Sequence, residues 1–347
     1  MALILLVSVD CFAGAGKDGF PFLTLGAGAR QEAMGGSGVS LPGEVNGAYW
    51  NPAAWGAVRG KEMSLYYASQ MDTARLGALS YAQGLERSTL GLQILTFDSG
   101  DIQGYDSSGG KTGTLAVKDS MVALGYGRPW GEDLTWGVNV KHVQETLPGA
   151  SASANALDAG LLYQKGDWPI RFGAALRNEG TQATFENEKT SLPRSVDFGA
   201  SYQALAQSLL ATVEGHEPSD GARYWTGGVE WWVYNTLAFR AGYDSGTDAG
   251  NGLTMGIGVK MKDFRIDYAY TNQGDSFGGA QRVGVSYRFG GAGDRAYQQG
   301  LALMQKGDYA AAVLKFKEAL DADPGNRAAM RALKEAAQKL RKERAAS

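Results

Sequence analysis

Strict alternation of apolar and polar residues runs through most of this chain, from about residue 62 onward, and is clearest between Gly252 and Phe289. The apolar residues of three consecutive segments there are Leu253, Met255, Ile257, Val259 and Met261, then Phe264, Ile266, Tyr268 and Tyr270, then Val283, Val285, Tyr287 and Phe289. A period of two residues predicts β-strands with one apolar and one polar face. Only Lys262 and Asp263 connect the first two segments, which forces an antiparallel hairpin.

The polar face of these predicted strands decides the fold class. It carries glycine, small polar residues and charges, where a soluble sandwich would place its core or a lysine-rich surface. The charged residues on this face are Lys141, Arg171, Arg177, Glu230, Arg240, Asp244, Lys260, Arg265, Asp267, Arg282 and Arg288. An Arg or Lys facing lipid would cost about 2–4 kcal/mol at the bilayer midplane, so we expect this set to line the lumen of a β-barrel.

Fourteen segments follow this pattern, and a bacterial barrel requires an even number. They cover residues 62–70, 74–83, 87–98, 119–130, 133–144, 156–165, 168–178, 193–204, 208–217, 223–233, 236–246, 252–262, 263–272 and 281–289. The sequence therefore predicts a mainly β protein, a closed antiparallel transmembrane β-barrel of about 14 strands over residues 62–289. An N-terminal hatch and a small C-terminal α-helical module complete it. A soluble β-protein with a helical tail is the alternative.

The connections between these segments alternate in length. Every second one is tight, such as Tyr234–Asn235, whereas the intervening ones include 99–118, 145–155 and 179–192. Short turns on one side and long loops on the other are typical of an outer-membrane barrel, whose long loops are extracellular. The N-terminal hatch and the C-terminal module would then both lie in the periplasm.

The first fifteen residues predict a secretory signal peptide, because an apolar run from Ala2 to Val9 leads to small residues that suit cleavage near Ala15. Lipid attachment at Cys11 is the alternative, for which Asp10 is a poor context. Cys11 is the only cysteine, so the cleaved chain would offer no disulfide and no thiolate metal site. The 33 Lys and Arg residues against 36 Asp and Glu exclude the basic footprint of a nucleic-acid binder.

Residues 16–61 lack the alternation and are rich in glycine and small residues, which permit close backbone approach. Asn51 precedes Pro52 and is therefore biased to an extended conformation. One interpretation is an irregular N-terminal loop; the other is a hatch that plugs the barrel mouth. The residues that define the predicted hatch are Gly28, Ala29, Arg30, Met34, Gly35, Gly36, Trp50, Asn51, Pro52 and Ala53.

These hatch residues, together with Tyr49, resemble the motifs of the PorV/PorQ group of outer-membrane barrels, which are themselves similar to the FadL fatty-acid transporters. The chain departs from the family pattern at Leu41–Glu44 and at Ala54–Trp55. Resemblance to PorV and PorQ implies a non-enzymatic accessory role in protein secretion or surface attachment, with periplasmic or outer-membrane protein partners. Resemblance to FadL implies uptake of a hydrophobic small-molecule ligand through a hatch-gated lumen and a lateral opening, from a barrel set in outer-membrane lipid.

A glycine-rich linker at 290–293 separates the strands from a segment of helical period at 294–347. Its residues match the tetratricopeptide pattern at Gly300, Leu303, Gly307, Tyr309, Ala312, Phe316, Ala319 and Pro324. Residues 327–344 then predict a charged amphipathic helix that caps the repeat. At least three repeats are usually needed for independent stability, so a single repeat should dock on a partner or self-associate.

Catalytic and metal chemistry find little support in the sequence. The only histidines, His142 and His216, lie on separate predicted strands, and a hydrolase would need one beside a serine or an acidic pair. The acids of the long first loop lack the spacing of a calcium loop, and the glycine clusters of the hatch follow no phosphate-binding context. No cofactor is implied, and we expect a protein that is not an enzyme.

The predicted lumen charges have two interpretations. One is a satisfied network of arginines and acids that stiffens the barrel around its plug. The other is a polar corridor for a solute or, by resemblance to FadL, a cation for the carboxylate of an amphiphile. The residues favour the network. The helical repeat favours the secretion role, because a simple transporter needs no protein-binding module, whereas a kinked strand facing the hatch would favour uptake.

Overall fold

The computed structural model describes residues 18–41, 43–58, 60–70, 73–186, 188–205, 208–247, 250–274, 278–289, 291–322 and 327–346. The predicted signal peptide at 1–15 therefore lies outside the described residues. Within the described part of the chain, none of the helices has the length and apolar character needed to cross a membrane.

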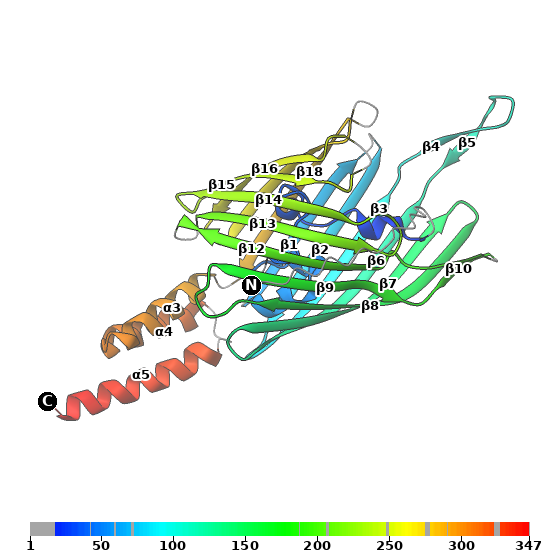
Figure 1. The fold of residues 1–347 in the computed structure, drawn as a ribbon. Helices are drawn as coiled ribbons and strands as arrows, with labels where there is room; N and C mark the ends of the chain where they lie inside the picture. Colours follow the sequence, from blue (N-terminus) through cyan, green and yellow to red (C-terminus); the bar gives the residue numbers. More distant parts are fainter. Residues whose placement is uncertain are drawn as a thin grey trace, which may run out of the picture.

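Fourteen antiparallel strands form a closed barrel, as the sequence predicts (Figure 1). Neighbours along the sequence are neighbours in the barrel, and β1 closes the ring against β18 with Leu65 opposite Val285. The strands are β1 (Lys61–Gln70), β2 (Ala74–Gly84), β3 (Thr89–Asp98), β6 (Lys118–Trp130), β7 (Leu134–Leu147), β8 (Ala150–Tyr163), β9 (Ile170–Gly180), β12 (Ser195–Ala204), β13 (Leu209–Pro218), β14 (Tyr224–Val233), β15 (Leu237–Asp244), β16 (Leu253–Met261), β17 (Phe264–Asn272) and β18 (Gly279–Phe289).

The two faces of the barrel wall differ as the alternation requires. The outer face exposes large apolar side chains, among them Leu65, Leu124, Val140, Phe172, Phe198, Val213, Trp231 and Ile257. The lumen face buries small, polar and charged residues. Such an apolar exterior would be unfavourable in water but is the surface that lipid requires.

The two ends of the barrel carry different connections, and we call them the turn end and the loop end. At the turn end, Tyr234 and Asn235 both have φ near 50° (50° and 52°), the conformation of a tight two-residue hairpin turn. The loop end carries two hairpins that leave the barrel, β4 (Ile102–Tyr105) with β5 (Lys111–Leu115) and β10 (Ala183–Phe185) with β11 (Glu188–Thr190). Figure 1 shows these hairpins at the end opposite the C-terminal helices.

One predicted loop, 145–155, is wrong. β7 and β8 continue to Leu147 and from Ala150, so that only Pro148 and Gly149 form the turn. The segment alternates alanine with serine, and this weak contrast in hydrophobicity hides the period of two. Its alanines are nevertheless buried in one core with the start of the hatch, which fixes the strand.

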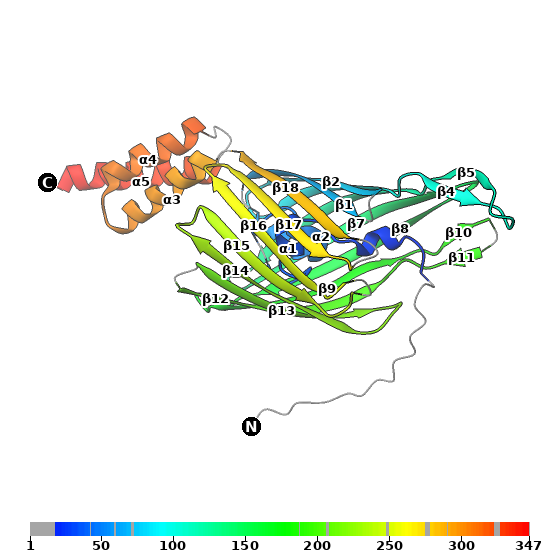
Figure 2. The same ribbon diagram turned by 90° about the horizontal axis from the view of Figure 1, so that it is seen from above.

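The N-terminal segment lies inside the ring of strands (Figure 2). It contains η1 (Pro21–Thr24), α1 (Ala29–Glu32), α2 (Gly47–Trp50) and η2 (Pro52–Ala57). α1 contacts β16, β17 and β18, and η2 contacts β3, β6, β7 and β8, so opposite sides of the segment touch opposite sides of the wall. We call residues 18–58 the hatch.

Three helices follow the barrel at the turn end: α3 (Gly291–Gln305), α4 (Tyr309–Ala322) and α5 (Arg327–Ala346). α3 begins at Gly291, earlier than predicted, so residues 291–293 of the expected linker belong to the helix. The helix can begin this early because the β18 ladder already ends at Phe289.

The predicted repeat residues lie where these helices meet. Ala312, Phe316 and Ala319 are fully buried, and a Cβ added at Gly300 would crowd the Phe316 ring. Gly307 adopts φ 81° in the turn before Tyr309, which begins α4. Pro324 lies outside the described residues. The assignment of these helices to the tetratricopeptide family stays a prediction.

Candidate functional site

Asn51 fixes the centre of the hatch. Its φ of −146° and ψ of 112° are extended, as expected ahead of Pro52. The side-chain Nδ2 donates to the carbonyl oxygens of Val39 at 2.7 Å and Leu161 at 3.0 Å, while Oδ1 accepts from the backbone N–H of Ala53 at 2.9 Å. Since Leu161 belongs to β8, one amide ties two hatch segments to the wall.

Aromatic residues of the hatch are packed rather than free. The Trp50 indole N–H donates to the carbonyl oxygen of Ala27 at 2.8 Å, and the Trp55 indole N–H donates to Asn139 Oδ1 of β7 at 2.7 Å. The guanidinium of Arg177 lies 5.5 Å from the centre of the Trp50 ring, within range of a cation–π contact. The predicted hatch residues are thus buried against the wall, except Arg30 and Gly36, which are half-buried.

Glycines on the lumen face allow this close approach. A Cβ at Gly137 would collide with the carbonyl of Pro52, and one at Gly173 would collide with the carbonyl of Val39. In the hatch itself, Gly35 has φ 78° and its backbone packs against that of Tyr243 on β15, so both its conformation and its surroundings require glycine. The wall and the hatch are therefore fitted to each other backbone to backbone.

Ion pairs join the hatch to the wall, beginning at Arg30. Its guanidinium donates two hydrogen bonds to the Glu230 carboxylate on β14, at 2.6 and 2.7 Å. Glu230 also accepts from Arg240 Nε of β15 at 2.7 Å. Glu230 is 2% exposed and Arg240 is 4% exposed, so one buried carboxylate balances two guanidinium groups.

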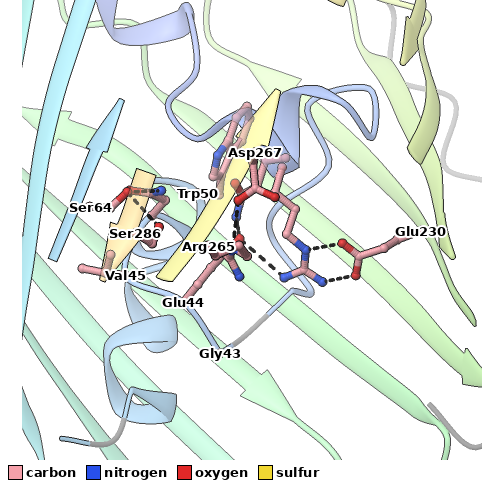
Figure 3. Close-up of polar contacts among 12 residues, drawn as sticks. Gly43, Glu44, Val45, Trp50, Ser64, Glu230, Arg265, Asp267 and Ser286 are labelled. Carbon is pink, nitrogen blue, oxygen red and sulfur yellow. Dashed lines mark hydrogen bonds and ion pairs between the residues drawn. The ribbon is translucent and has the colours of Figure 1, made fainter. Parts of the chain in front are cut away.

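The network continues to a carboxylate of the hatch, Glu44. Arg240 pairs with Asp267 at 2.8 Å, Asp267 pairs with Arg265 at 2.7 Å, and Arg265 pairs in turn with Glu44. Glu44 also lies 3.4 Å from Arg30 Nη1, which closes the circuit. Figure 3 shows Glu44 and Arg265 directed toward each other between the hatch and β17.

A second hatch carboxylate, Glu32, pairs with Arg282 of β18 at 2.9 Å. Burial raises the pKa of the Glu32 carboxyl, and the neighbouring Arg282 guanidinium opposes that rise. Two more pairs join wall residues to each other, Lys141 with Asp158 at 2.6 Å and Arg177 with Asp197 at 2.7 Å.

The remaining predicted lumen charges lie apart from this network. Arg171 donates to Gln164 at 2.7 and 3.0 Å near the turn end, and Asp244 accepts from the backbone N–H of Gly246 at 2.8 Å at the loop end. Arg288 pairs with Glu62 at 2.8 Å but is exposed, as is Lys260, where the strands reach the turn end.

Two wall residues on β13 that were not among the predicted site residues lie close to the hatch. Glu214 accepts hydrogen bonds of 2.9–3.0 Å from the backbone N–H groups of Gly38, Val39 and Ser40. His216, two residues along the same strand, bonds Asp197 through Nδ1 at 2.8 Å. Both fall on the lumen face of β13, and alternation alone could have placed them there.

His216 also connects the wall to the hatch. Its Nε2 lies 3.0 Å from Thr226 Oγ1, and that hydroxyl lies 3.0 Å from Ser37 Oγ of the hatch. An acid and a histidine therefore do meet here, which the sequence analysis did not expect. His142 lies elsewhere, exposed, with Nδ1 3.0 Å from Asn155 Oδ1. Among the described residues, no group of three His, Cys, Asp or Glu could hold a metal ion.

A bulge in β9 lies next to the hatch. The pairing of β8 with β9 shifts register between Leu157 and Ala159, and Asn178 adopts φ 58°. The Asp158 carboxylate accepts from the Asn178 backbone N–H at 2.8 Å and so stabilises the irregular strand. A bulge bends a strand and interrupts its ladder.

A cavity of about 240 Å³ lies above the hatch at the loop end. Its lining comes from the loop-end residues of the strands and from hatch residues that include Gly35, Gly36 and Trp50, which form its floor. Leu23, Leu25 and Tyr224 add apolar surface. We call this space the loop-end cavity.

No protein-family model matches the chain, and no curated protein does. Solved structures do match. The toluene transporter TbuX of Ralstonia pickettii aligns with 76% of this chain and 98% of its own, at 17% identity and a TM-score of 0.58. The toluene transporter TodX of Pseudomonas putida aligns with 75% and 96%, at 14% identity and a TM-score of 0.55.

A FadL homologue of Pseudomonas aeruginosa matches similarly, covering 76% of this chain and 99% of its own, at 11% identity and a TM-score of 0.53. At these identities the likeness concerns the fold. The chain has a FadL-like outer-membrane β-barrel fold.

Proposed function

We propose that the protein is a non-enzymatic outer-membrane barrel that takes up small hydrophobic molecules, with the hatch as its gate. The observation that carries the proposal is the loop-end cavity, whose floor is the hatch itself, so that a solute entering between the loops would stop at Trp50. The fold supports this reading, because the matched structures include two toluene transporters.

The interactions that hold the hatch to the wall are compatible with a role as a gate. Arg30, Glu32 and Glu44 attach it to the wall through buried ion pairs. Such pairs fix geometry strongly but contribute little net stability compared with apolar packing. A hatch held in this way can shift while the strand ladder of the barrel stays intact.

The bulge in β9 supports a lateral exit between β8 and β9. The interrupted ladder lies where Arg177 approaches the hatch ring of Trp50, and Arg177 and Asn178 both line the loop-end cavity. A solute at the hatch would therefore be adjacent to the weakest part of the wall. In this proposal the loop end faces the outside and the turn end faces the periplasm, as short turns do in outer-membrane barrels.

Uptake of toluene tests this function. A Gram-negative host that lacks a hydrophobic uptake barrel of its own should accumulate radiolabelled toluene several-fold faster when it produces this protein in its outer membrane. Equal rates with and without the folded protein would refute the proposal.

A second candidate is the accessory role in secretion or surface attachment that the resemblance to PorV and PorQ implies. The observation that favours it is the C-terminal module, which has a core of its own around Phe316 and meets the barrel through ion pairs of Arg295 with Asp263 and Arg331 with Glu86. Leu314, 67% exposed, leaves apolar surface for a protein partner. We expect the module to act as a periplasmic protein-binding repeat.

Truncation after Phe289 tests this second role. Affinity purification from detergent-solubilised membranes should recover defined protein partners with the full chain and lose them with the truncated one, while both barrels stay folded. Identical partner sets from the two chains would exclude a working role for α3–α5.

A further inference from the structure

The size of the loop-end cavity limits what it can hold. At about 240 Å³ it falls below the 300–1,000 Å³ or so of sites for drug-sized ligands. It exceeds the roughly 150 Å³ cavity that accommodates benzene in another protein. A solute with a single substituted ring fits between these limits, whereas a long acyl chain would have to extend beyond the cavity.

The apolar part of the lining suits such a ring. Leu23 and Leu25 of the hatch contribute aliphatic surface, and Trp50 and Tyr224 contribute aromatic surface. Tyr224 is itself held in place, because its ring stacks on that of His216 with 4.6 Å between centroids. A rigid aromatic surface favours a planar ligand.

The two arginines that line the cavity beside the hatch already have acidic partners. Arg177 is paired with Asp197, and Arg282 is paired with Glu32 and also donates to Thr271 at 2.6 Å. A charged solute would have to compete with these buried pairs. The cavity therefore favours a neutral molecule over an anion.

Two amides in the lining lack partners. Gln70, at the loop end of β1, is 4% exposed, and its Nε2 has no hydrogen-bond partner among the described residues. The Oε1 of Gln273, after β17, is likewise buried without one. A buried polar atom without a partner is unfavourable, so both sites gain from a ligand that accepts one hydrogen bond and donates another.

We propose that the loop-end cavity selects neutral single-ring solutes that carry a hydroxyl group, such as phenols, over plain aromatic hydrocarbons. Gln70 donates to the hydroxyl oxygen, Gln273 accepts its proton, and the ring packs against Trp50 and Tyr224. This inference rests on the proposed uptake function and specifies its substrate class.

Paired binding measurements test the inference on the full-length protein in detergent. p-Cresol and toluene differ by one hydroxyl group, and p-cresol should bind at least about tenfold more tightly, because its hydroxyl makes two hydrogen bonds that toluene lacks. Gln70→Leu should remove most of this preference, measured as the ratio of the toluene and p-cresol dissociation constants. Gln93→Leu is the matched control, because Gln93 is also buried with an unpartnered amide oxygen but does not line the cavity.

The outcomes distinguish a failure of the substrate class from a failure of the uptake function. If toluene binds and p-cresol binds no better, or if Gln70→Leu keeps the preference, the substrate class is wrong while uptake of hydrophobic molecules stands. If neither solute binds and neither enters cells through the barrel, the proposed function fails and this inference fails with it. The comparison of the two solutes on the unaltered protein decides the question even where a variant does not fold.

Discussion

Replacing Glu230 with glutamine is expected to lower the free energy of unfolding by about 3–5 kcal/mol, the usual effect of removing one partner from a buried ion pair. Glu230 pairs with Arg30 of the hatch and with Arg240 of β15, and the Glu230 and Arg240 side chains are almost fully buried. Glutamine keeps the shape of the side chain but leaves three basic groups, Arg30, Arg240 and Arg265, with only two carboxylates, Glu44 and Asp267. Urea unfolding in detergent micelles, followed by tryptophan fluorescence, measures the change.

Glu217→Gln provides the control for this prediction. Glu217 pairs with Arg223, but both side chains are about half exposed, at 52% and 48%. An exposed pair contributes about 0–1 kcal/mol, so this variant should unfold almost like the parent. Equal destabilisation by the two substitutions would mean that the buried network does not hold the hatch in the barrel.

Replacing Gly137 with valine is expected to displace the hatch and open the lumen to ions. A Cβ at this position collides with the carbonyl of Pro52, at the start of η2. β7 is fixed by β6 and β8 on both sides, so the hatch segment 52–57 should yield rather than the strand. Overpacking of this kind costs about 1–3 kcal/mol. Single-channel conductance in planar bilayers should rise well above that of the parent.

Gly215→Val is the matched control for conductance. Gly215 lies on the outer face of β13, and a Cβ there meets nothing within 4 Å. Valine suits a strand, so this barrel should fold and conduct like the parent. A folded Gly137→Val barrel with parental conductance would show that η2 does not block the lumen.

Much of the barrel could be predicted from sequence because lipid imposes a simple rule on each strand. In a membrane, an apolar residue at every second position indicates a strand with one face toward lipid, and all fourteen predicted strands are present. The rule fails where contrast is low: the alternating alanines and serines before Asn155 gave no signal, and only their packing against Phe20 of the hatch defines them as strand.

The candidate site was harder to predict from the sequence than the barrel wall. Alternation assigns Glu214 and His216 to the lumen. Glu214, however, bonds Ser40 of the hatch, more than a hundred residues away, and His216 reaches Ser37 of the hatch only through Thr226. The path of the hatch depends on wall glycines that leave room for its backbone, and on ion pairs such as Arg30 with Glu230. No local sequence pattern specifies either. The hatch motif indicated which residues matter, not which wall residues they meet.

The preference between the two functions also changed once the structure was known. The helical module made secretion the favoured interpretation from sequence, whereas the cavity above the hatch and the bulge at Asn178 support uptake. The module remains without a role in the uptake proposal.

The most direct test of the central claim is to lock the hatch to the wall and measure toluene uptake. Ser40 Oγ and Thr212 Oγ1 lie 3.1 Å apart, and neither residue lines the loop-end cavity. A disulfide between Ser40→Cys and Thr212→Cys should therefore form with little distortion. We predict that uptake by the oxidised double variant falls to background, that reduction restores it, and that each single variant transports like the parent. Equal uptake by the oxidised and reduced double variant, with the disulfide verified by mass spectrometry, would contradict a hatch-gated route.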